Sequence, residues 1–537
     1  MIKDLIIALS LANLCMIRGW SYVSFTLSPS SHYYMKYPST VNHFTAVIIM
    51  ILLLAALFFV AITLARRSKY PALMTAARVA FLLTLTIPVN GILSNYKISV
   101  QNNLYLVLIA LVLLELLLVL KIYKKNPSRK LYFDIFSFLN KALLIMSAFL
   151  LFNIFQTAWQ LARMDPSVFS DKASAPLMSG ELSHPRVLLL IFDEMSQGMV
   201  FDSRPAGVEL TEFDRFKNQA LYANNAYPPG GETDISLPSI VTGRMVSEFK
   251  PIKPNELMIT FEGESRQSGW STIPNIFSKV HEMSLNTSVV GWYHPYGRLF
   301  GGIVTSCSWY PYGPFRQMSL AESFAVQVEN LVDIIPFGKR LRLSNNIFAS
   351  DILIQQGRYN NYLDIMEDTK EAVCNPDYGL ILAHWPVPHP PGIYDRTKNA
   401  FRLEGGSYLD NLVLADQTLG ELRRVMEDAG TWENTNVIIT SDHWWRSDMW
   451  SSKLLWTEED ELASLTGEKD HRVPFIIKMA GQNDLLNYNQ KFNTVVIHDL
   501  ILAILKNEFS RPEEVVNWLN NNVTSFRIPD YSSKKQN

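Results

Sequence analysis

The chain begins with five long apolar runs, which lie within its first 162 residues and are separated by short polar loops. The runs are Leu5–Leu27, Phe44–Ala65, Val79–Tyr96, Leu104–Leu120 and Ala142–Ala162. A helix needs about 20 apolar residues to cross the roughly 30 Å hydrocarbon core of a bilayer. Buried helices of a soluble protein are the alternative, but five such runs so close together favour the membrane. The pattern therefore predicts an N-terminal bundle of five transmembrane helices.

Positive charges are distributed unevenly over the loops between these runs. The loops after the second and fourth runs carry Arg66, Arg67, Lys69, Lys121, Lys124, Lys125, Arg129 and Lys130, whereas the other two carry only Lys36 and Lys97. Loops rich in Lys and Arg stay in the cytoplasm, so the N-terminus is expected there. After five crossings, everything beyond Ala162 lies outside. We therefore expect a multi-pass protein of the inner (plasma) membrane whose C-terminal part works in the periplasm or extracellular space.

Two charged residues interrupt the apolar runs. Arg18 and Glu115 each lie about 11 or 12 residues from a predicted membrane surface, which at 1.5 Å per residue is near the middle of the bilayer. Isolated charges at that depth are costly and usually find partners. We predict a contact between Arg18 and Glu115. The alternative is a shifted first span whose arginine reaches an interface.

Beyond a polar linker, Arg163–Pro185, the pattern changes to short buried strands that alternate with helices. Unbroken apolar runs, typical of strands buried on both faces, are Arg186–Phe192, Thr287–Trp292, Tyr378–Ala383, Asn436–Thr440 and Pro474–Lys478. Helical patterns lie between them, as at Tyr408–Ala429. This alternation predicts an α/β domain with a mainly parallel central sheet between helices. The predicted domains are an anchor of residues 1–162, a linker of residues 163–185 and a soluble domain of residues 186–537.

Composition narrows the classes of partner. The chain has 48 Lys and Arg against 50 Asp and Glu, a net charge of −2, and no basic stripe beyond the anchor. A nucleic-acid partner is therefore not expected. Of three cysteines, Cys307 and Cys374 fall in the soluble domain, where an oxidising compartment would let them pair if the fold brings them close. The sequence leaves that pairing and the oligomeric state open.

Ionisable residues gather at the ends of the predicted strands. The first strand ends in Asp193-Glu194, the third ends in His384 with His389 five residues later, the fourth ends in Asp442-His443, and His471 stands just before the fifth. Each one alone is as readily a cap or a loop hydrogen bond. Because function in parallel sheets gathers beyond the carboxyl ends of the strands, four such edges together indicate a site.

A glycine-rich loop offers a nucleophile for that site. In the stretch Gly230–Arg244, two glycines precede Thr233, Pro238 suits a first helical turn, and Gly243 suits a helix C-terminus. Thr233 would then lie at a helix N-terminus, where free N–H groups and the helix dipole favour an anion. Its hydroxyl is placed to attack phosphorus or sulfur, provided that something activates it. The alternative is an ordinary N-cap threonine.

A metal ion would supply that activation. Carboxylates and imidazoles suit Zn²⁺, and Asp442 with His443 would give it one oxygen and one nitrogen. Asp193 would add a third ligand, and the Thr233 hydroxyl would complete a tetrahedral site that promotes loss of its proton. One zinc ion is expected; a second ion and another divalent metal stay open. The remaining histidines, His384, His389 and His471, would act as hydrogen-bond donors, as general acid or as ligands of a second metal.

These motifs resemble the alkaline phosphatase superfamily, in its sulfatase-like branch, over about Arg186 to Gly481. Sulfatases carry Cys-x-Pro-Ser-Arg with Thr-Gly-Arg nine residues after the cysteine, and here Thr242-Gly243-Arg244 stands nine residues after Thr233. A threonine in place of the modifiable cysteine, with Leu237 in place of the arginine, makes a formylglycine sulfatase an unfavourable interpretation. Thr-x-x-Ser-x-Pro, the two spaced histidines, the Asp-His pair and the five-span anchor are more similar to phosphoethanolamine transferases, lipoteichoic acid synthases and phosphoglycerol transferases.

The resemblance implies an alkaline-phosphatase-like catalytic domain and a Zn²⁺ site formed by Asp193, Thr233, Asp442 and His443, with Glu194 as a substitute ligand. It also implies that Thr233 takes a phospho-linked headgroup, such as phosphoethanolamine, from a membrane phospholipid and passes it to an envelope glycan or lipid. Phosphodiesterase or phosphatase activity, with water as the acceptor, is one alternative. A non-catalytic lipid-sensing regulator is another, although such a domain would be expected to lose its nucleophile or metal ligands.

The chain departs from that family in two places. After the Asp-His pair the transferases usually continue with Gly-Glu, whereas this chain has Trp444-Trp445-Arg446. Phosphoethanolamine transferases also carry several disulfides in the soluble domain, and this domain can form at most one. The identities of donor and acceptor therefore do not carry over. An aromatic segment, Trp292–Arg298, either lines a headgroup cleft or forms a well-packed loop.

Overall fold

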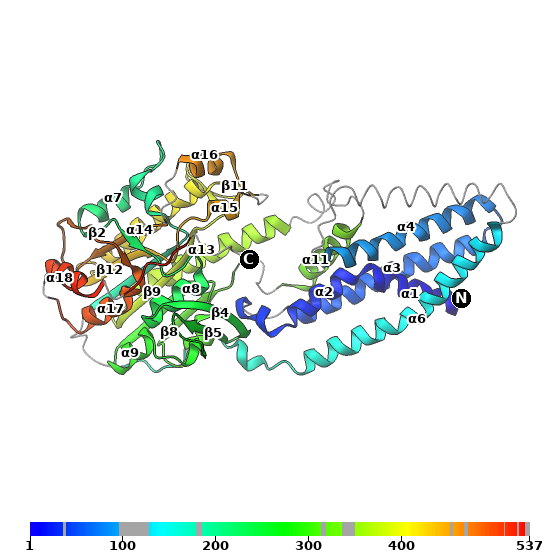
Figure 1. Cartoon of the computed structure of the whole chain (residues 1–537), viewed down its shortest axis with the longest axis horizontal. Helices are drawn as coiled ribbons and strands as arrows, with labels where there is room; N and C mark the ends of the chain where they lie inside the picture. The colour runs from blue at the N-terminus through cyan, green and yellow to red at the C-terminus, as the bar shows by residue number, and fades with distance from the viewer. Residues whose placement is uncertain are drawn as a thin grey trace. The chain divides into compact units, whose positions relative to one another are not determined.

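The computed structural model describes residues 1–35, 39–95, 128–178, 185–312, 318–335, 350–451, 455–466, 471–509, 511–523 and 526–531. The chain divides into two compact units, whose elements are labelled in Figure 1. The first contains Met1–Ser31, Tyr37–Asp165 and Gln317–Asp351, and the second contains His32–Lys36, Pro166–Arg316 and Ile352–Asn537. The main division falls at the predicted linker. Two segments are assigned differently from the sequence-based domains: residues 32–36 belong to the second unit, and residues 317–351 belong to the first.

The first unit is built from helices. They are α1 (Ile2–Cys15), α2 (Ile17–Thr26), α3 (Thr40–Arg67), α4 (Pro71–Asn95), α6 (Ser128–Ala162) and α11 (Leu320–Ile334). The short 3₁₀ helix η2 (Pro166–Phe169) follows α6 and belongs to the second unit. Two helices are long and apolar enough to cross a membrane, α3 and the Ser137–Ala162 part of α6. Helices α1 and α2 pass the same test as a pair, but they are bent by 57° at the break between them.

The five-helix anchor is therefore supported only in part. The second and fifth predicted spans lie within α3 and α6, and the first corresponds to the bent pair. The third lies in α4, whose apolar stretch Ala80–Leu93 is shorter than a membrane span. The fourth, Leu104–Leu120, lies outside the described residues. The described part of the chain thus supplies two helices of spanning length, or three if the bent pair counts as one.

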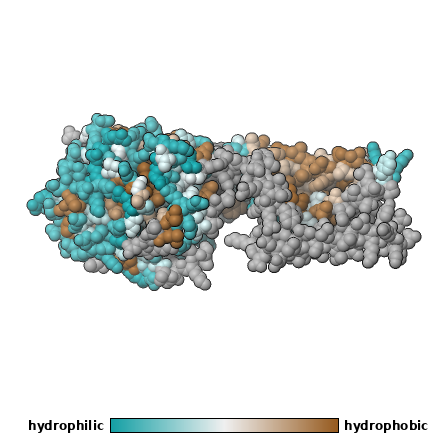
Figure 2. All heavy atoms as spheres, turned by 90° about the horizontal axis from the view of Figure 1, so that it is seen from above, coloured by the Kyte–Doolittle hydropathy of each residue, from teal (hydrophilic) through white to brown (hydrophobic). Residues whose placement is uncertain are grey.

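Large apolar side chains cover the outer surfaces of these helices. Exposed examples are Leu53, Leu57, Val60 and Leu64 on α3 and Phe149, Phe152 and Phe155 on α6. The visible described atoms of this unit are largely hydrophobic, whereas those of the second unit are mostly hydrophilic (Figure 2). Exposed apolar surface of this extent is what a lipid environment requires of a helix, and it is costly in water.

Arg18 has a partner that the sequence did not suggest. Its Nη2 lies 3.2 Å from Oδ2 of Asp333 in α11. Glu115, the predicted partner, lies outside the described residues. Helix α11 is fastened to the unit at its end, where Asn90 Nδ2 donates to the Ile334 carbonyl oxygen at 2.9 Å. A segment counted with the soluble domain thus supplies the countercharge for Arg18.

An eight-stranded sheet forms the centre of the second unit. Its order is β14-β2-β13-β12-β1-β9-β7-β8. The strands are β1 (Arg186–Asp193), β2 (Leu221–Ala223), β7 (Asn286–Trp292), β8 (Ser306–Tyr310), β9 (Tyr378–Pro388), β12 (Thr435–Ser441), β13 (Phe475–Lys478) and β14 (Leu486–Tyr488). All neighbours are parallel except β13, which runs antiparallel to β12 and β2. The predicted α/β domain with a mainly parallel sheet is confirmed.

Helices cover both faces of this sheet. They are α7 (Thr211–Asn218), α8 (Thr233–Thr242), α9 (Ile276–Glu282), α10 (Tyr296–Phe300), α13 (Ser350–Cys374), α14 (Tyr408–Asp428), α15 (Ser447–Trp450), α16 (Glu458–Thr466), α17 (Ile497–Leu505) and α18 (Pro512–Asn522). Smaller sheets are β4 (Val246–Lys253), β5 (Glu256–Phe261) and β6 (Gln267–Gly269); β10 (Gly392–Asp395) and β11 (Ala400–Gly406); and β3 (Ala226–Tyr227) and β15 (Phe492–Asn493).

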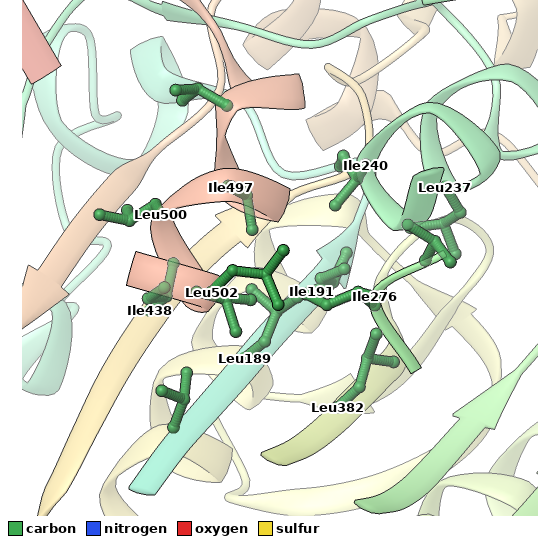
Figure 3. Close-up of a cluster of buried hydrophobic side chains, with 14 of the residues drawn as sticks. Leu189, Ile191, Leu237, Ile240, Ile276, Leu382, Ile438, Ile497, Leu500 and Leu502 are labelled. Carbon is green, nitrogen blue, oxygen red and sulfur yellow. The ribbon is translucent and has the colours of Figure 1, made fainter. Parts of the chain in front are cut away.

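Strand β1 illustrates why its sequence is unbroken in apolar residues. Leu189 and Ile191 point into one core, where they meet Leu237 of α8 and Ile497 of α17 (Figure 3). The intervening side chains of β1, such as Leu190, point into a second core on the opposite face of the sheet. Both faces are therefore buried, as expected for a central parallel strand. The first core also seats α8 against the sheet.

The third strand and the cysteines refine the sequence-based expectations. Strand β9 continues to Pro388, four residues beyond the predicted end at His384, so His384 lies within the strand rather than at its end. Cys307 and Cys374 are both free thiols, so the disulfide that the sequence left open is not formed.

Candidate active site

The ends of β1 and β12 bring two buried aspartates to the same edge of the sheet. The strands are parallel neighbours with Phe192 opposite Ser441, so Asp193 and Asp442 follow side by side. The Ser441 hydroxyl fastens the two ends, because it donates to the Phe192 carbonyl oxygen at 2.6 Å and accepts from the Met195 N–H at 2.8 Å. The Ser441 side chain therefore holds the two strand ends, and with them the two carboxylates, in a fixed relative position.

Thr233 is the first residue of α8, as the sequence predicted. Gly243 ends that helix in the left-handed conformation, with φ of 68°. Pro238, which was expected in the first turn, lies in the second, where it removes one backbone hydrogen bond. Ser236 closes the preceding loop, since its hydroxyl contacts both the N–H and the carbonyl oxygen of Gly230 at 3.1 Å. The serine of Thr-x-x-Ser thus holds the loop that presents the threonine.

Thr233 meets the aspartates and His443 in one cluster. Its Oγ1 donates to Asp442 Oδ2 at 2.7 Å and lies 3.4 Å from His443 Nε2. The same nitrogen lies 3.4 Å from Asp442 Oδ2 and 3.5 Å from Asp193 Oδ1. All four side chains are buried. The four residues that the sequence singled out therefore lie in one cluster around His443, although up to 250 positions separate them along the chain.

The protonation of His443 follows from its neighbours. Its Nδ1 lies 3.0 Å from the Trp444 carbonyl oxygen, which can only accept, so Nδ1 carries the proton and Nε2 turns a lone pair to the cluster. Burial lowers the pKa of His443, which keeps the ring neutral at pH 7. Burial raises the pKa of Asp442 to about 6, and burial together with the Asp442 carboxylate raises the pKa of Asp193.

This donor set fits a divalent cation. The oxygen and nitrogen ligand atoms of Asp193, Asp442 and His443 all lie within 4.8 Å of one another. Within the described residues, Asp193 Oδ1 is buried and has no hydrogen-bond partner. Asp193, Asp442 and His443 are also the one group of three or more such residues with that geometry in the described chain. Two carboxylates, an imidazole lone pair and a hydroxyl directed at one point suit a tetrahedral zinc ion, and other divalent metals accept similar ligands.

Glu194, the substitute ligand, is engaged elsewhere. Arg446 Nε donates to its carboxylate at 2.7 Å, and Trp450 Nε1 donates to it at 2.9 Å. The backbone of Glu194, directly after Asp193, lies in the left-handed region with φ of 63°. Burial raises the pKa of Glu194, and the Arg446 guanidinium opposes that rise. The structure therefore favours Asp193 over Glu194 as the ligand from β1.

His384 and His389 are buried near the cluster but have other hydrogen-bond partners. His384 Nδ1 lies 3.2 Å from the Trp292 carbonyl oxygen and 3.1 Å from the Tyr296 hydroxyl, and its Nε2 has no partner in the described chain. His389 Nδ1 contacts the Pro390 carbonyl oxygen. Burial lowers the pKa of His384 to about 3 and also lowers the pKa of His389. Both rings are therefore neutral at pH 7 and suit hydrogen bonding better than general acid catalysis.

His471 reaches the same edge of the sheet because β13 is antiparallel. The start of that strand, Phe475, lies opposite Thr440, so residues preceding β13 lie where the parallel strands end. The ring of His471 lies 4.3 Å from that of Trp444, measured between centroids. Trp444 in turn covers Gly231, where a Cβ would come within 2.7 Å of the indole. Trp444 thus packs between the Gly230-Gly231 loop and His471.

Several residues of the site were not found by sequence reasoning. Arg446 had a signal, since it stands three residues after the Asp-His pair. Tyr293 and His294 had a weaker one, the aromatic segment Trp292–Arg298, which runs from the end of β7 into α10 and whose members also contact α8. Tyr33 and Tyr34 had no sequence signal, because they lie in a short loop between apolar runs.

No protein-family model matches this chain, and a search of curated proteins finds no relative. Solved structures do resemble it. The lipoteichoic acid synthase LtaP from Listeria monocytogenes matches with 12% identity over 63% of this chain and 76% of that chain, with a TM-score of 0.37. The PsFucS1 sulfatase from Pseudoalteromonas sp. matches with 14% identity over 61% and 69%, with a TM-score of 0.39.

A protein in the alkaline phosphatase superfamily from Vibrio parahaemolyticus matches with 11% identity over 64% of this chain and 71% of that chain, with a TM-score of 0.35. Identities and scores of this size do not establish a shared activity. The solved structures that this chain resembles thus include a sulfatase, a lipoteichoic acid synthase and a protein of the alkaline phosphatase superfamily.

Proposed function

We propose that this chain is a membrane-anchored, metal-dependent enzyme that transfers a phospho-linked headgroup through a covalent intermediate on Thr233. The observation that carries the proposal is the buried contact of Thr233 Oγ1 with Asp442, at 2.7 Å, within a cluster completed by Asp193 and His443. A threonine that served only as an N-cap would not need two buried carboxylates and an imidazole around its hydroxyl.

In the first half-reaction, Thr233 Oγ1 attacks the phosphorus of a phospholipid headgroup such as phosphoethanolamine. The Oγ1 proton leaves towards Asp442 Oδ2, its hydrogen-bond acceptor. A bond forms between Oγ1 and phosphorus, and the bond from phosphorus to the diacylglycerol oxygen breaks, so that oxygen gains a proton. Attack at the N-terminus of α8 is favourable because the helix dipole stabilises the negative charge of the phosphoryl oxygens.

In the second half-reaction, a hydroxyl group of an envelope glycan or lipid attacks the same phosphorus and releases Thr233. A zinc ion held by Asp193, Asp442, His443 and Thr233 would lower the barrier by stabilising negative charge on oxygen. His384 Nδ1 faces the Trp292 carbonyl oxygen and therefore carries the proton, so Nε2, which has no partner in the described chain, is an acceptor available to the hydroxyl of the incoming group. Neither histidine of the His384–His389 pair needs to change its protonation state for this role.

The apolar helices support a lipid donor. Two helices of spanning length keep the enzyme at a membrane, where phospholipid is abundant and free phosphate esters are not. The charge pattern of the loops places the second unit outside the inner membrane in this proposal. Hydrolysis, with water as the acceptor, shares the first half-reaction; analysis of products with and without candidate glycan acceptors would separate the two activities.

The test is mass spectrometry of the tryptic peptide of residues 218–244, from full-length protein purified with its native lipids and quenched in acid. We expect a headgroup-sized mass increase on Thr233, and the added mass identifies the headgroup. Thr233→Ala should abolish both the adduct and turnover. Thr242→Ala, which removes another threonine hydroxyl from the same helix and peptide, is the matched control and should keep both. An active Thr233→Ala variant would contradict the proposal.

A further inference from the structure

A short segment that precedes the soluble domain by about 150 residues contacts the nucleophile helix. Residues 32–36 belong to the second unit, and the 3₁₀ helix η1 (Pro29–Tyr34) ends in two adjacent tyrosines. Tyr33 is fully buried in the same hydrophobic core as α8, and Tyr34 packs beside it. Two large side chains from a distant part of the sequence therefore contribute to the catalytic unit.

Tyr34 binds the carboxylate that follows the nucleophile. Its hydroxyl lies 2.9 Å from Asp234 Oδ2 and 3.1 Å from Oδ1. The Tyr293 hydroxyl lies 2.7 Å from Asp234 Oδ2 and 3.2 Å from the Tyr34 hydroxyl. Asp234 is buried, so its carboxylate would be strongly unfavourable without these donors. By binding the Asp234 side chain, the two tyrosines together fix the orientation of the first turn of α8.

Tyr33 acts on the backbone of the nucleophile through His294. The imidazole Nε2 lies 3.4 Å from the Thr233 carbonyl oxygen, which can only accept, so Nε2 carries the proton. The other nitrogen, Nδ1, is then an acceptor and receives the Tyr33 hydroxyl at 2.9 Å. Tyr33 therefore selects the tautomer of His294 that can hold the Thr233 carbonyl.

From this geometry we infer that Tyr33 and Tyr34 are positioning residues of the active centre: Tyr34 acts through Asp234 and Tyr33 through His294 to aim Thr233 at the substrate. The inference rests on the proposed function of Thr233 as the nucleophile. It also means that the catalytic unit is not complete in residues 186–537. A shift of about 1 Å in a reacting group can lower a rate by about a hundredfold, so loss of a single hydroxyl is expected to have a smaller but measurable effect.

The test uses full-length protein in lipid nanodiscs and measures kcat and KM for phospholipid cleavage, with a melting temperature for each variant. Tyr34→Phe keeps the ring and removes only the hydroxyl. We expect kcat to fall about tenfold with KM unchanged within twofold, because orientation rather than binding is lost. Tyr310→Phe is the matched control, since it removes a tyrosine hydroxyl that donates to another aspartate of the same unit, Asp368, and it should leave both constants unchanged.

A second comparison separates positioning from general structural support. In an Asp234→Ala background, Tyr34→Phe should change kcat by less than twofold, because the residue through which Tyr34 acts is gone. The same tenfold loss in both backgrounds, or no loss in either, would overturn the inference. If Asp234→Ala does not fold, Tyr293→Phe replaces it: it removes the other donor to the same carboxylate and must lower kcat while KM stays unchanged, and an unaltered kcat overturns the inference.

The outcome is distinguishable from failure of the proposed function. An adduct on Thr233 together with wild-type kinetics for Tyr34→Phe would reject the positioning role alone. Turnover without Thr233 would reject the proposed function itself.

Discussion

Thr233 lies between two buried polar clusters that satisfy their charges in different ways. On one side, Asp193 and Asp442 face an imidazole lone pair, and one oxygen of Asp193 has no hydrogen-bond partner among the described residues. On the other side, the single carboxylate of Asp234 receives the hydroxyls of two tyrosines. The first cluster is rich in acceptors and poor in donors, whereas in the second the donors match the acceptor.

The difference separates buried polar groups that can bind a metal ion from buried polar groups that fix the backbone carrying them. Acceptors that face one another without donors are costly in a folded protein unless a cation joins them, so the first cluster indicates a metal site. A carboxylate with its own donors needs nothing further, and such a group fixes the backbone that carries it. Predictions that alter one cluster and leave the other intact test this division.

The largest expected effect comes from the first cluster. Asp442→Ala removes a carboxylate that contacts both Thr233 and His443, so zinc content should fall from about one ion per chain to near zero. Activity should fall on the order of 10³-fold or more, because both the ion and the acceptor of the threonine proton are lost. Metal analysis of purified protein and assay of phospholipid cleavage measure these quantities. Full zinc content in this variant would contradict the metal site.

An intermediate effect is expected at the boundary of that cluster. Glu194→Gln should keep about one zinc ion per chain, because Arg446 and Trp450 already occupy the carboxylate. Stability should fall by about 1.5–3 kcal/mol, the usual contribution of a hydrogen bond to a charged group. Metal analysis and denaturant unfolding check the two halves of this prediction. A loss of zinc equal to that of Asp442→Ala would instead make Glu194 the ligand from β1.

The smallest effect is a pH dependence of stability. Burial raises the pKa of Asp442 to about 6, above the value near 4 of an unfolded aspartate. After metal removal the folded state therefore binds more protons than the unfolded state between about pH 4 and 6, and this group's contribution to stability decreases as pH rises through that window. Zinc binds the deprotonated form, so it should raise the melting temperature by more at pH 7.5 than at pH 5. The difference should disappear in Asp442→Asn; equal zinc effects at both pH values would contradict the prediction.

The sequence was sufficient for the part of the site that lies at strand ends. Unbroken apolar runs located β1 and β12, and in parallel strands the residues that follow must share one edge, which brings Asp193 and Asp442 together. Local chemistry also placed Thr233 at the start of a helix that ends at Gly243. Expectations were less accurate where a strand continued through polar and proline residues: β9 runs past His384 to Pro388 because the neighbouring strand β1 still pairs with it there.

What the sequence alone determined is the set of elements, because apolar periodicity and turn residues act over a few neighbouring positions. Only the tertiary structure decided that Tyr33 and Tyr34 contact α8, about 200 positions away, and that Asp333 of α11 is the partner of Arg18. It also decided that Arg446 forms an ion pair with Glu194, whereas Asp193 contacts His443 in the cluster. Such pairings depend on which surfaces pack together, and a packed contact between distant segments leaves no periodic pattern in either of them.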